Sequence, residues 1–235
     1  MDITYRSQEA EIMDDFLLQG EELRDTLDKI AVINRLLGGN ALIMGSIKKL
    51  LKNNKTSKTI TIADVGCGNG DMLRVLANYG RKEKISLNLI GIDANAYTIS
   101  HAERLSVNYP NISYKCIDIF KEDFASLKYD IVLCTLTLHH FNDNEITDII
   151  TIFNKNAAIG VIINDLHRSK VAYRLFELVC RLFRLKRMPR EDGLVSILRG
   201  FRKNELEAFS EKINLKKYSI QWKWAFRYQW IIYKV

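Results

Sequence analysis

The sequence predicts an α/β fold with a doubly wound, largely parallel sheet covered by helices on both faces. Short β-rich stretches alternate with helical stretches between residues 59 and 164, a pattern typical of such sheets. Acidic residues stand at the ends of three successive predicted strands. The chain has 235 residues, of which 47% are hydrophobic, and this is enough for one well-filled core.

The predicted elements follow one another in regular order. The expected strands are 59–64, 86–93, 112–116, 129–135 and 157–164, and the expected helices between them are 72–79, 97–107 and 145–154. Residues 203–212 should form a further helix. Residues 213–220 and 224–235 should form two strands joined by a short turn, at least one of them antiparallel to its neighbours.

The first 51 residues show a helical pattern without alternating strands. Residues 8–51 carry helical periodicity, and Gly38, Gly39 and Asn40 break them into two expected helices. The polar stretch 52–58 is the expected linker to the first strand.

The positive charge of the chain is concentrated near one end. The net charge is +7, but residues 166–235 hold 17 Lys and Arg against 6 Asp and Glu, whereas residues 1–165 hold 18 against 22. A basic region of this kind favours an anionic partner, which can be a substrate, a membrane surface or a nucleic acid.

Composition also limits where the protein is expected. The longest apolar run, 157–163, has seven residues, against roughly 20 for a membrane-spanning helix, so we expect no transmembrane segment. The polar, acidic amino terminus predicts neither a signal nor a transit peptide. The four cysteines show no CxxC pair and no metal-ligand spacing. We therefore expect a reduced, cytoplasmic protein without a bound metal.

The segment AlaAspValGlyCysGlyAsnGly at residues 63–70 is the most informative part of the sequence. Its glycines lie at a strand-to-helix turn, where they let a ligand approach the backbone. A dinucleotide fingerprint starting at Gly66 needs glycine where Asp71 stands, and one starting at Gly68 needs glycine where Leu73 stands. No Gly-Lys-Ser/Thr follows, so the loop is not a phosphate-binding Walker loop either.

Two further acidic residues follow the next strands. Asp93 closes the second strand, where a carboxylate can accept hydrogen bonds from both hydroxyls of a ribose. Asp118 follows the third strand, next to Ile119 and Phe120. Because ligands of open α/β sheets bind at the carboxyl ends of the strands, we expect these groups and Asp64 in one crevice.

The ordered motifs ADVGCGNG, GID, CIDIF and YDIVLCTLTLHHF over residues 58–165 resemble class I S-adenosylmethionine-dependent methyltransferases. The resemblance implies a Rossmann-like seven-stranded sheet with an antiparallel carboxyl-terminal strand, and S-adenosyl-L-methionine as cofactor. It divides the chain into a helical amino-terminal cover, 1–57, and a methyltransferase domain, 58–235, with an insertion at 166–201. The cofactor residues that it implies are Asp64, Gly66, Gly68 and Gly70 for the methionine part, Asp93 and Ala94 around the ribose, Asp118 and Ile119 for the adenine, and Thr135 and Leu136 beneath the sulfonium.

Methyl transfer often requires a base that removes a proton from the acceptor. His140 and His167 follow the fourth and fifth strands and are the candidate catalytic bases, with packing or cofactor contact as the alternative for the His139-His140 pair. His101 is expected on the surface of a helix. The residues expected on the substrate side are His139, Asp165, Arg168 and Arg35.

The insertion contains a basic amphipathic helix, which we interpret as a lid with an apolar floor, with contact to a membrane or carrier protein as the alternative. A fainter resemblance to bacterial phenolic, quinol and polyketide-type methyltransferases predicts O-methylation of a small acceptor, lipid-like or anionic. The alternatives are C-methylation of a quinone-type ring, an RNA or protein substrate, or a non-catalytic cofactor-binding protein. We expect no nucleic-acid partner. The aromatic residues of the last strands predict core packing, a homodimer interface or both.

Overall fold

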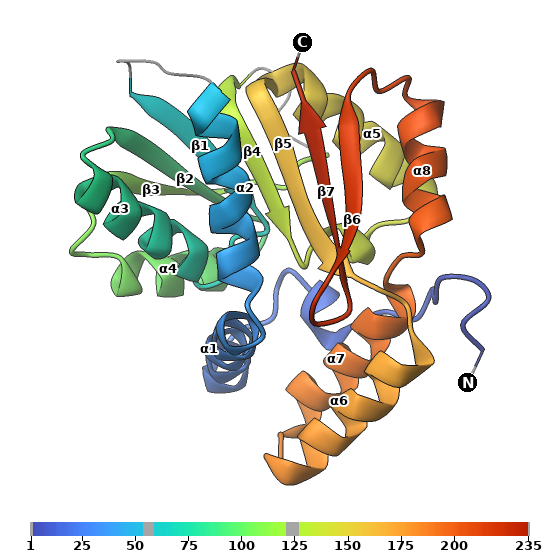
Figure 1. The fold of residues 1–235 in the computed structure, drawn as a ribbon. Helices are drawn as coiled ribbons and strands as arrows, with labels where there is room; N and C mark the ends of the chain where they lie inside the picture. The colour runs from blue at the N-terminus through green and yellow to red at the C-terminus, as the bar shows by residue number, and fades with distance from the viewer. Residues whose placement is uncertain (1, 54–58, 121–126, 235) are drawn as a thin grey trace.

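The computed structural model describes residues 2–53, 59–120 and 127–234 and contains one seven-stranded sheet (Figure 1). The strand order is β3-β2-β1-β4-β5-β7-β6. The strands are β1 (Ile60–Val65), β2 (Leu87–Asp93), β3 (Ile112–Cys116), β4 (Tyr129–Thr135), β5 (Ala157–Leu166), β6 (Tyr218–Lys223) and β7 (Arg227–Tyr233). Strands β1 to β5 are parallel, and β7 runs antiparallel to both β5 and β6. The predicted fold class is confirmed.

Strand β6 begins later than predicted. Residues 213–217 do not continue the strand, because α8 (Lys203–Lys212) ends in a turn there. Asn214 adopts φ +53°, and the Leu215 amide donates to the Ser210 carbonyl. The chain therefore needs five residues to leave the helix before it can enter the sheet.

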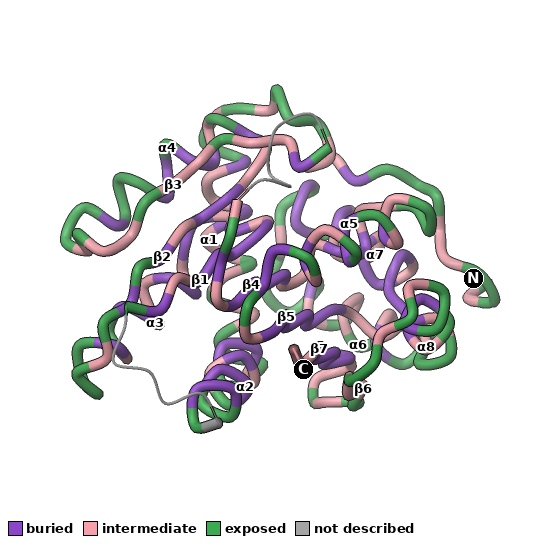
Figure 2. The backbone as a smooth tube through the Cα atoms, turned by 90° about the horizontal axis from the view of Figure 1, so that it is seen from above, coloured by how far each residue is buried: buried purple, intermediate pink, exposed green. Residues whose placement is uncertain are grey.

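Helices cover the sheet on both faces. On one face lie α2 (Gly39–Asn53), α3 (Asp71–Glu83) and α4 (Ala96–Leu105), and on the other lie α5 (Asp143–Asn156) and α8. The central strands β1, β4 and β5 are buried along most of their length (Figure 2). Each face has its own apolar core, with Ile47 and Leu76 in one and Ile149 and Phe153 in the other.

A third group of helices lies beyond the carboxyl ends of the parallel strands (Figure 1). It consists of α1 (Glu21–Leu36), α6 (Lys170–Leu182), α7 (Arg187–Arg199) and the 3-10 turns η1 (Ile12–Asp14) and η3 (Leu138–His140). We call η1, α1, α6 and α7 the cover. They come from both ends of the chain, and α1 and α7 pack against each other.

The amino-terminal segment is less helical than predicted. The break at Gly38, which adopts φ +80°, is confirmed, but residues 8–20 form only the short η1 before α1 begins. The backbone amides of Ile12 and Met13 donate to the carboxylate of Asp192 at 2.7 and 3.1 Å. This distant partner holds the segment in an irregular conformation that periodicity does not reveal.

The insertion also differs from the prediction, since it holds two helices rather than one. The second of them, α7, contains Asp192 and Gly193. In the part of the chain that the structure describes, no single helix is long and apolar enough to cross a membrane, and α1 with α2 meets that criterion only as a pair bent by 65°.

Candidate active site

A cavity of about 1040 Å³ lies where the carboxyl ends of the parallel strands meet the cover. Its wall on the sheet side comes from the ends of β1, β2, β4 and β5, and its opposite wall from α1, α6 and α7. Every residue expected to bind cofactor lines it except Gly70. The crevice predicted at the strand ends is therefore a cavity between the sheet and the cover.

The glycine loop needs its glycines for different reasons. Gly66 and Gly68 line the cavity with φ +72° and +51°. A Cβ on Gly66 would lie 2.2 Å from Thr137 Oγ1, whereas one on Gly68 would meet nothing closer than Leu27 Cδ2 at 3.6 Å. Gly70, with φ +76°, begins α3, and a Cβ there would lie 2.1 Å from the Tyr114 hydroxyl. The left-handed backbone of the loop thus depends on residues without a side chain.

Two carboxylates, the buried Asp64 and the partly buried Asp93, face the cavity behind this loop. Asp64 is 3% exposed, and none of the described residues forms a hydrogen bond with its Oδ1. Burial and the neighbouring charge of Asp93 raise the pKa of Asp64 to about 7. Burial also raises the pKa of Asp93, although that carboxylate accepts hydrogen bonds from the amides of Gly68 and Asn95, each at 3.1 Å. Such a pair favours a ligand that brings positive charge or hydroxyl donors.

The remaining predicted cofactor residues surround the same space. Ala94 follows Asp93, and Asp118 and Ile119 line the cavity beyond β3. Thr135 ends β4, and Leu136 turns away from the strand with φ +52° while its amide donates to the Asn164 carbonyl. These positions line the cavity from the glycine loop after β1 to the end of β4.

The cover is hydrogen-bonded to this wall through side chains of α1 and the loop before it. Asp28 accepts from Asn69 at 2.8 Å and lies 2.9 Å from His101 Nε2. Asn95 donates to the Leu18 carbonyl at 2.8 Å. The expectation that His101 is a surface residue is wrong, because the ring is 5% exposed beneath α1.

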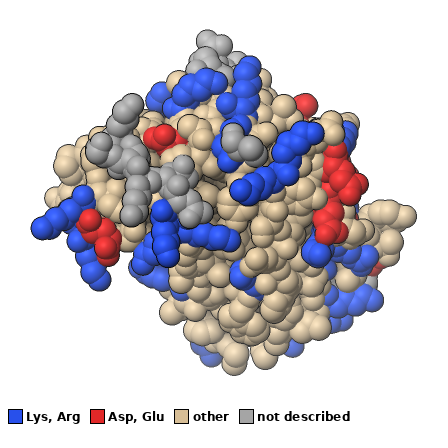
Figure 3. Space-filling view, turned by 45° about the horizontal axis from the view of Figure 1, so that its top comes forward, with Lys and Arg blue, Asp and Glu red and all other residues tan. Residues whose placement is uncertain are grey.

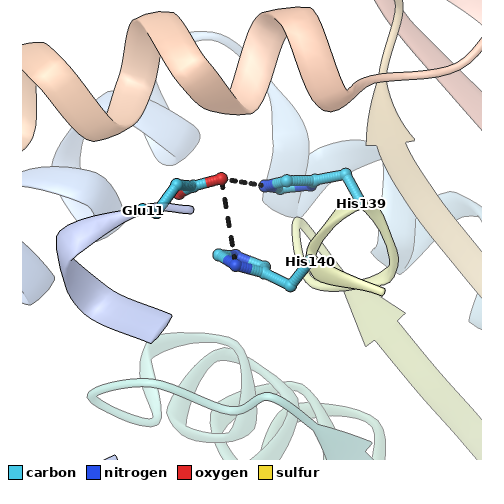
Figure 4. A group of neighbouring side chains, drawn as sticks. All are labelled: Glu11, His139 and His140. Atoms are coloured by element: carbon cyan, nitrogen blue, oxygen red, sulfur yellow. Dashed lines mark ion pairs between the residues drawn. The ribbon is translucent and has the colours of Figure 1, made fainter. Parts of the chain in front are cut away.

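His139 lies at the centre of an ion-pair network between the cover and the sheet (Figure 4). Its Nδ1 lies 2.7 Å from Asp165, at the end of β5, and its Nε2 lies 3.5 Å from Glu11, just before η1. Burial opposes protonation of the ring, but the charges of Asp165 and Glu11 prevail and raise the pKa of His139 to about 10. In the same way His139 lowers the pKa of Glu11 and of Asp165 against the effect of their burial. A protonated ring held between two carboxylates, by a hydrogen bond at Nδ1 and an ion pair at Nε2, is a structural cation and not a base.

Among the described residues, the ligand atoms of Glu11, His139 and His140 lie within 4.8 Å of one another, as those of a metal site would. The other charges nearby favour ion pairing instead. Arg199 places a guanidinium nitrogen 3.8 Å from Glu11 and 2.6 Å from Asp14. The histidine proton and this guanidinium already supply positive charge to these carboxylates, so we interpret the group as an ion-pair network.

His140 lines the cavity and is held by a different carboxylate. Its Nδ1 lies 2.6 Å from Asp14 Oδ1. Hydrogen bonds from His140 and Arg199 lower the pKa of Asp14 well below its usual range, against the effect of its partial burial. An ionised carboxylate only accepts hydrogen bonds, so Nδ1 carries a hydrogen, and in the neutral form of the ring Nε2 keeps its lone pair.

His167 lines the same cavity in the opposite protonation pattern. Burial and the nearby charges of Arg168 and Arg202 lower the pKa of His167. Its Nδ1 lies 3.2 Å from the indole nitrogen of Trp222. Since an indole N–H can only donate, Nδ1 is the acceptor and the hydrogen of the neutral ring lies on Nε2.

The residues expected on the substrate side have other partners. Arg168 is 1% exposed and donates to Glu205 at 2.6 and 3.0 Å and to the Gly200 carbonyl at 2.6 Å. Arg35 is half-exposed and lies 3.9 Å from Asp71. Neither of them, nor Asp165, lines the cavity, whereas His139 does.

The sequence analysis did not identify Glu11 and Asp192 as site residues. Glu11 is 6% exposed and accepts a hydrogen bond from Ser196 at 2.8 Å, across 185 residues. Asp192 holds η1 in place. Neither carries a local sequence signal, because each acts on a partner more than a hundred residues away.

Comparison with known proteins identifies the domain. Residues 62–158 match the model of a methyltransferase domain family. The putative methyltransferase 235L of Invertebrate iridescent virus 6 is 32% identical over 88 residues, which are 37% of this chain and 30% of the viral protein. The chain thus spans less than a third of that relative.

Several solved structures share the fold. The plantazolicin methyltransferase BpumL, in complex with a triazolic desmethylPZN analog and SAH, matches 91% of this chain and 90% of its own, with 15% identity and a TM-score of 0.64. The CurJ carbon methyltransferase matches 83% of this chain and 53% of its own, with 12% identity and a TM-score of 0.62. The magnesium protoporphyrin IX methyltransferase ChlM of Synechocystis PCC 6803, with bound SAM, matches 94% and 87%, with 14% identity and a TM-score of 0.55. Residues 62–158 therefore match a methyltransferase domain family, and the chain has the seven-stranded fold of the solved methyltransferases, as its motifs predict.

Proposed function

We propose that this chain transfers a methyl group from S-adenosyl-L-methionine to the hydroxyl of a small, largely apolar acceptor of phenolic, quinol or polyketide-like type. The observation that carries the proposal is one continuous cavity. It contains the cofactor motifs on the sheet side, apolar side chains on the cover side and His140 among its lining residues.

The donor set suits this cofactor. The unpartnered, buried Oδ1 of Asp64 would accept from the ammonium of the methionine part, and Asp93 would accept from the ribose hydroxyls. The solved relatives BpumL and ChlM hold SAH and SAM, which supports the cofactor predicted from the motifs. When bound, the cofactor supplies an activated methyl group on a positively charged sulfur.

His140 is the proposed general base, and Asp14 is its positioning residue. The hydrogen bond from Nδ1 to Asp14 leaves the Nε2 lone pair to take the proton of the acceptor hydroxyl. The freed oxygen would be the group that receives the methyl supplied by the bound cofactor. Asp14 would stabilise the imidazolium that results, and the cavity walls would hold the two reactants in line. His167 cannot serve in the same way while its Nε2 carries the hydrogen.

The cover provides an apolar binding site for the acceptor body. The side chains that face this part of the cavity are Met13, Phe16, Leu23, Leu27, Ile30, Ile33, Leu37, Leu175, Phe176, Leu178, Val179, Leu182, Ile197 and Phe226. Such a lining binds aromatic or aliphatic groups through burial of apolar surface. It favours a small molecule over a nucleic acid.

Figure 3 brings forward the end of the molecule opposite the cover, where Lys and Arg side chains stand in several separate groups between acidic and uncharged residues. A nucleic-acid groove on that face would need a continuous basic surface along the backbone path. Three further expectations remain predictions within this proposal. They are the division into an amino-terminal helical segment, 1–57, and a methyltransferase domain, 58–235, with an insertion at 166–201; the cytoplasmic location; and the homodimer.

The test is a turnover assay that follows formation of S-adenosylhomocysteine with a panel of phenols, quinols and β-keto compounds of increasing apolar length. We expect His140→Gln to lower turnover by about 10²- to 10⁴-fold and leave cofactor binding intact. His167→Gln, the matched control on the other side of the cavity, should stay near wild type. Equal losses in both variants would remove the assignment of the base, and methylation of carbon alone would replace the hydroxyl acceptor by a ring carbon.

A further inference from the structure

Helix α6 exposes an apolar stripe to solvent. Val171, Leu175, Leu178 and Leu182 recur at intervals of three and four residues and therefore lie on one face of the helix. Their exposed fractions are 58%, 45%, 50% and 70%, and Phe183, just beyond the helix, is 72% exposed. A contiguous exposed apolar surface of this kind marks an interaction site.

The stripe continues into the rim of the active-site cavity. Leu175, Leu178 and Leu182 line that cavity while remaining exposed. Other large apolar side chains share both properties and come from separate segments of the cover and the β6–β7 turn: Phe16, Ile30, Leu37 and Trp224. A molecule that leaves or enters the cavity on this side therefore passes over apolar side chains at the molecular surface.

Basic side chains flank the same stripe. Residues 170–190 contain seven Lys and Arg and one Glu. Arg174 lies on α6, and Lys186 and Arg187 lie at the turn to α7; their side chains are 72%, 58% and 77% exposed and pair only with partly exposed acids. Arg181 and Arg184 are exposed, and no acidic side chain of the described residues forms an ion pair with either.

The position of α6 allows a flat surface to reach it. Helices α6 and α7 project from the end of the molecule beyond the carboxyl ends of the strands (Figure 1). An apolar stripe bordered by Lys and Arg is the pattern of a helix that lies in the interface of an anionic membrane. A protein partner would need complementary acidic side chains around an apolar groove, whereas a bilayer supplies both chemistries in one plane.

We infer that the α6 stripe and the apolar rim dock on an anionic lipid bilayer, so that a membrane-dissolved acceptor enters the cavity from the lipid phase. The second clause rests on the proposed function, whereas docking itself does not. The sequence favoured a lid with an apolar floor over membrane contact. A lid accounts for the side of α6 that faces the cavity but leaves the outer apolar stripe in water.

The test is co-sedimentation of the full chain with phosphatidylcholine vesicles, with and without phosphatidylglycerol. We expect binding to the anionic vesicles only, weakened by added salt. The double variants Val171→Glu/Phe183→Glu and Arg181→Glu/Arg184→Glu should each lower the vesicle partition coefficient by at least about tenfold. None of these four residues lines the cavity. Val107→Glu, which places one carboxylate at a 79% exposed valine away from the cover, is the control and should bind as wild type.

Each alternative has its own result. Unchanged S-adenosylhomocysteine affinity and unchanged melting temperature show that the variants remain folded. Absence of binding to anionic vesicles, or an equal loss of binding in Val107→Glu, would overturn the inference. The inference would also fail if the wild-type chain formed a dimer and bound no vesicles, and the Val171→Glu/Phe183→Glu substitutions abolished that dimer. Vesicle binding without turnover on any acceptor would contradict the proposed function and leave docking in place.

Discussion

The two walls of the cavity differ in how their polar groups are arranged. On the sheet side, the carboxylates come from contiguous motifs at strand ends, and no described residue forms a hydrogen bond with the buried Oδ1 of Asp64. On the cover side, the acids already have partners in the protein. Glu11 lies against His139, and the partly buried Asp14 lies against Arg199 and His140. The buried Asp192 accepts hydrogen bonds from the amides of Ile12 and Met13.

This difference separates binding groups from structural ones. A buried carboxylate without a partner destabilises the free protein and is poised for a ligand, whereas a paired one holds distant segments together. The cover pairs also join residues far apart in the chain, since Arg6 contacts Asp143 and the carbonyl of His139. Substitutions in the two walls should therefore change the free energy of unfolding in opposite directions.

The largest effect is expected in the network of the cover. His139→Ala removes the cation between Glu11 and Asp165 and leaves both carboxylates buried, which should lower the free energy of unfolding by about 3–5 kcal/mol. Denaturant unfolding measures it. His140→Ala is the control, because Asp14 keeps Arg199 as a partner, and it should lose much less.

The pH dependence of this loss follows from the raised pKa. The folded-state pKa of His139 is about 10, above the ordinary 6.5, so its stabilisation is fully present below about pH 6.5 and disappears as the pH rises through about 10. The difference between wild type and His139→Ala should therefore shrink between neutral pH and pH 10. Equal losses in the two histidine variants, or a pH-independent difference, would contradict the ion-pair interpretation.

The opposite sign is expected at Asp64. Its pKa rises from 3.8 to about 7 on folding, so the penalty is absent below the unfolded-state pKa and complete above pH 7. At slightly alkaline pH, Asp64→Asn should raise the free energy of unfolding by about 2–4 kcal/mol while weakening cofactor binding at least about tenfold. Thermal unfolding and titration calorimetry with S-adenosylhomocysteine measure both, and Asp118→Asn, half-buried in the same cavity, serves as control. A destabilised Asp64→Asn protein would show that the carboxylate already has a stabilising partner.

The same contrast explains what the sequence could predict. Asp64, Gly66 and Asp93 each lie within a few residues of a strand end, so hydrophobic pattern and spacing were sufficient to bring them to one edge of the sheet. Thr135 was implied by the family resemblance. The short turn between the last two strands predicted an antiparallel strand at the carboxyl end.

The conformation and contacts of the cover could not be predicted in this way. Residues 8–20 are irregular because Asp192 binds their amides, and Arg168 is buried because Glu205 and three separate carbonyls surround it. His101 looks solvent-exposed by its helical position until α1 lies over it. In each case the deciding partner is remote in sequence, and no periodicity encodes it.

A smaller effect is expected in the pH dependence of cofactor binding. Because an ammonium ligand favours the ionised form of Asp64, binding below pH 7 must displace a proton, and affinity should fall by up to about tenfold per pH unit between pH 7 and pH 6. Calorimetry with S-adenosylhomocysteine at several pH values measures the slope. In Asp64→Asn the slope should flatten, whereas a steep slope retained in that variant would assign the proton to another group.

No effect is expected from a chelator. If Glu11, His139 and His140 form an ion-pair network, EDTA should change neither the melting temperature nor turnover, because the proton of His139 and the guanidinium of Arg199 already supply the positive charge that a metal would bring. Added Zn²⁺ or Mn²⁺ should likewise leave the melting temperature unchanged, since binding would have to displace the proton and approach a fixed cation. Loss of turnover in EDTA that one of these ions restores would turn the same three residues into a metal site, and His140 would then be a ligand and could not position its Nε2 as the base. The chelator experiment thus also tests the assignment of His140 as the base, because a metal ion bound by Glu11, His139 and His140 would occupy that histidine.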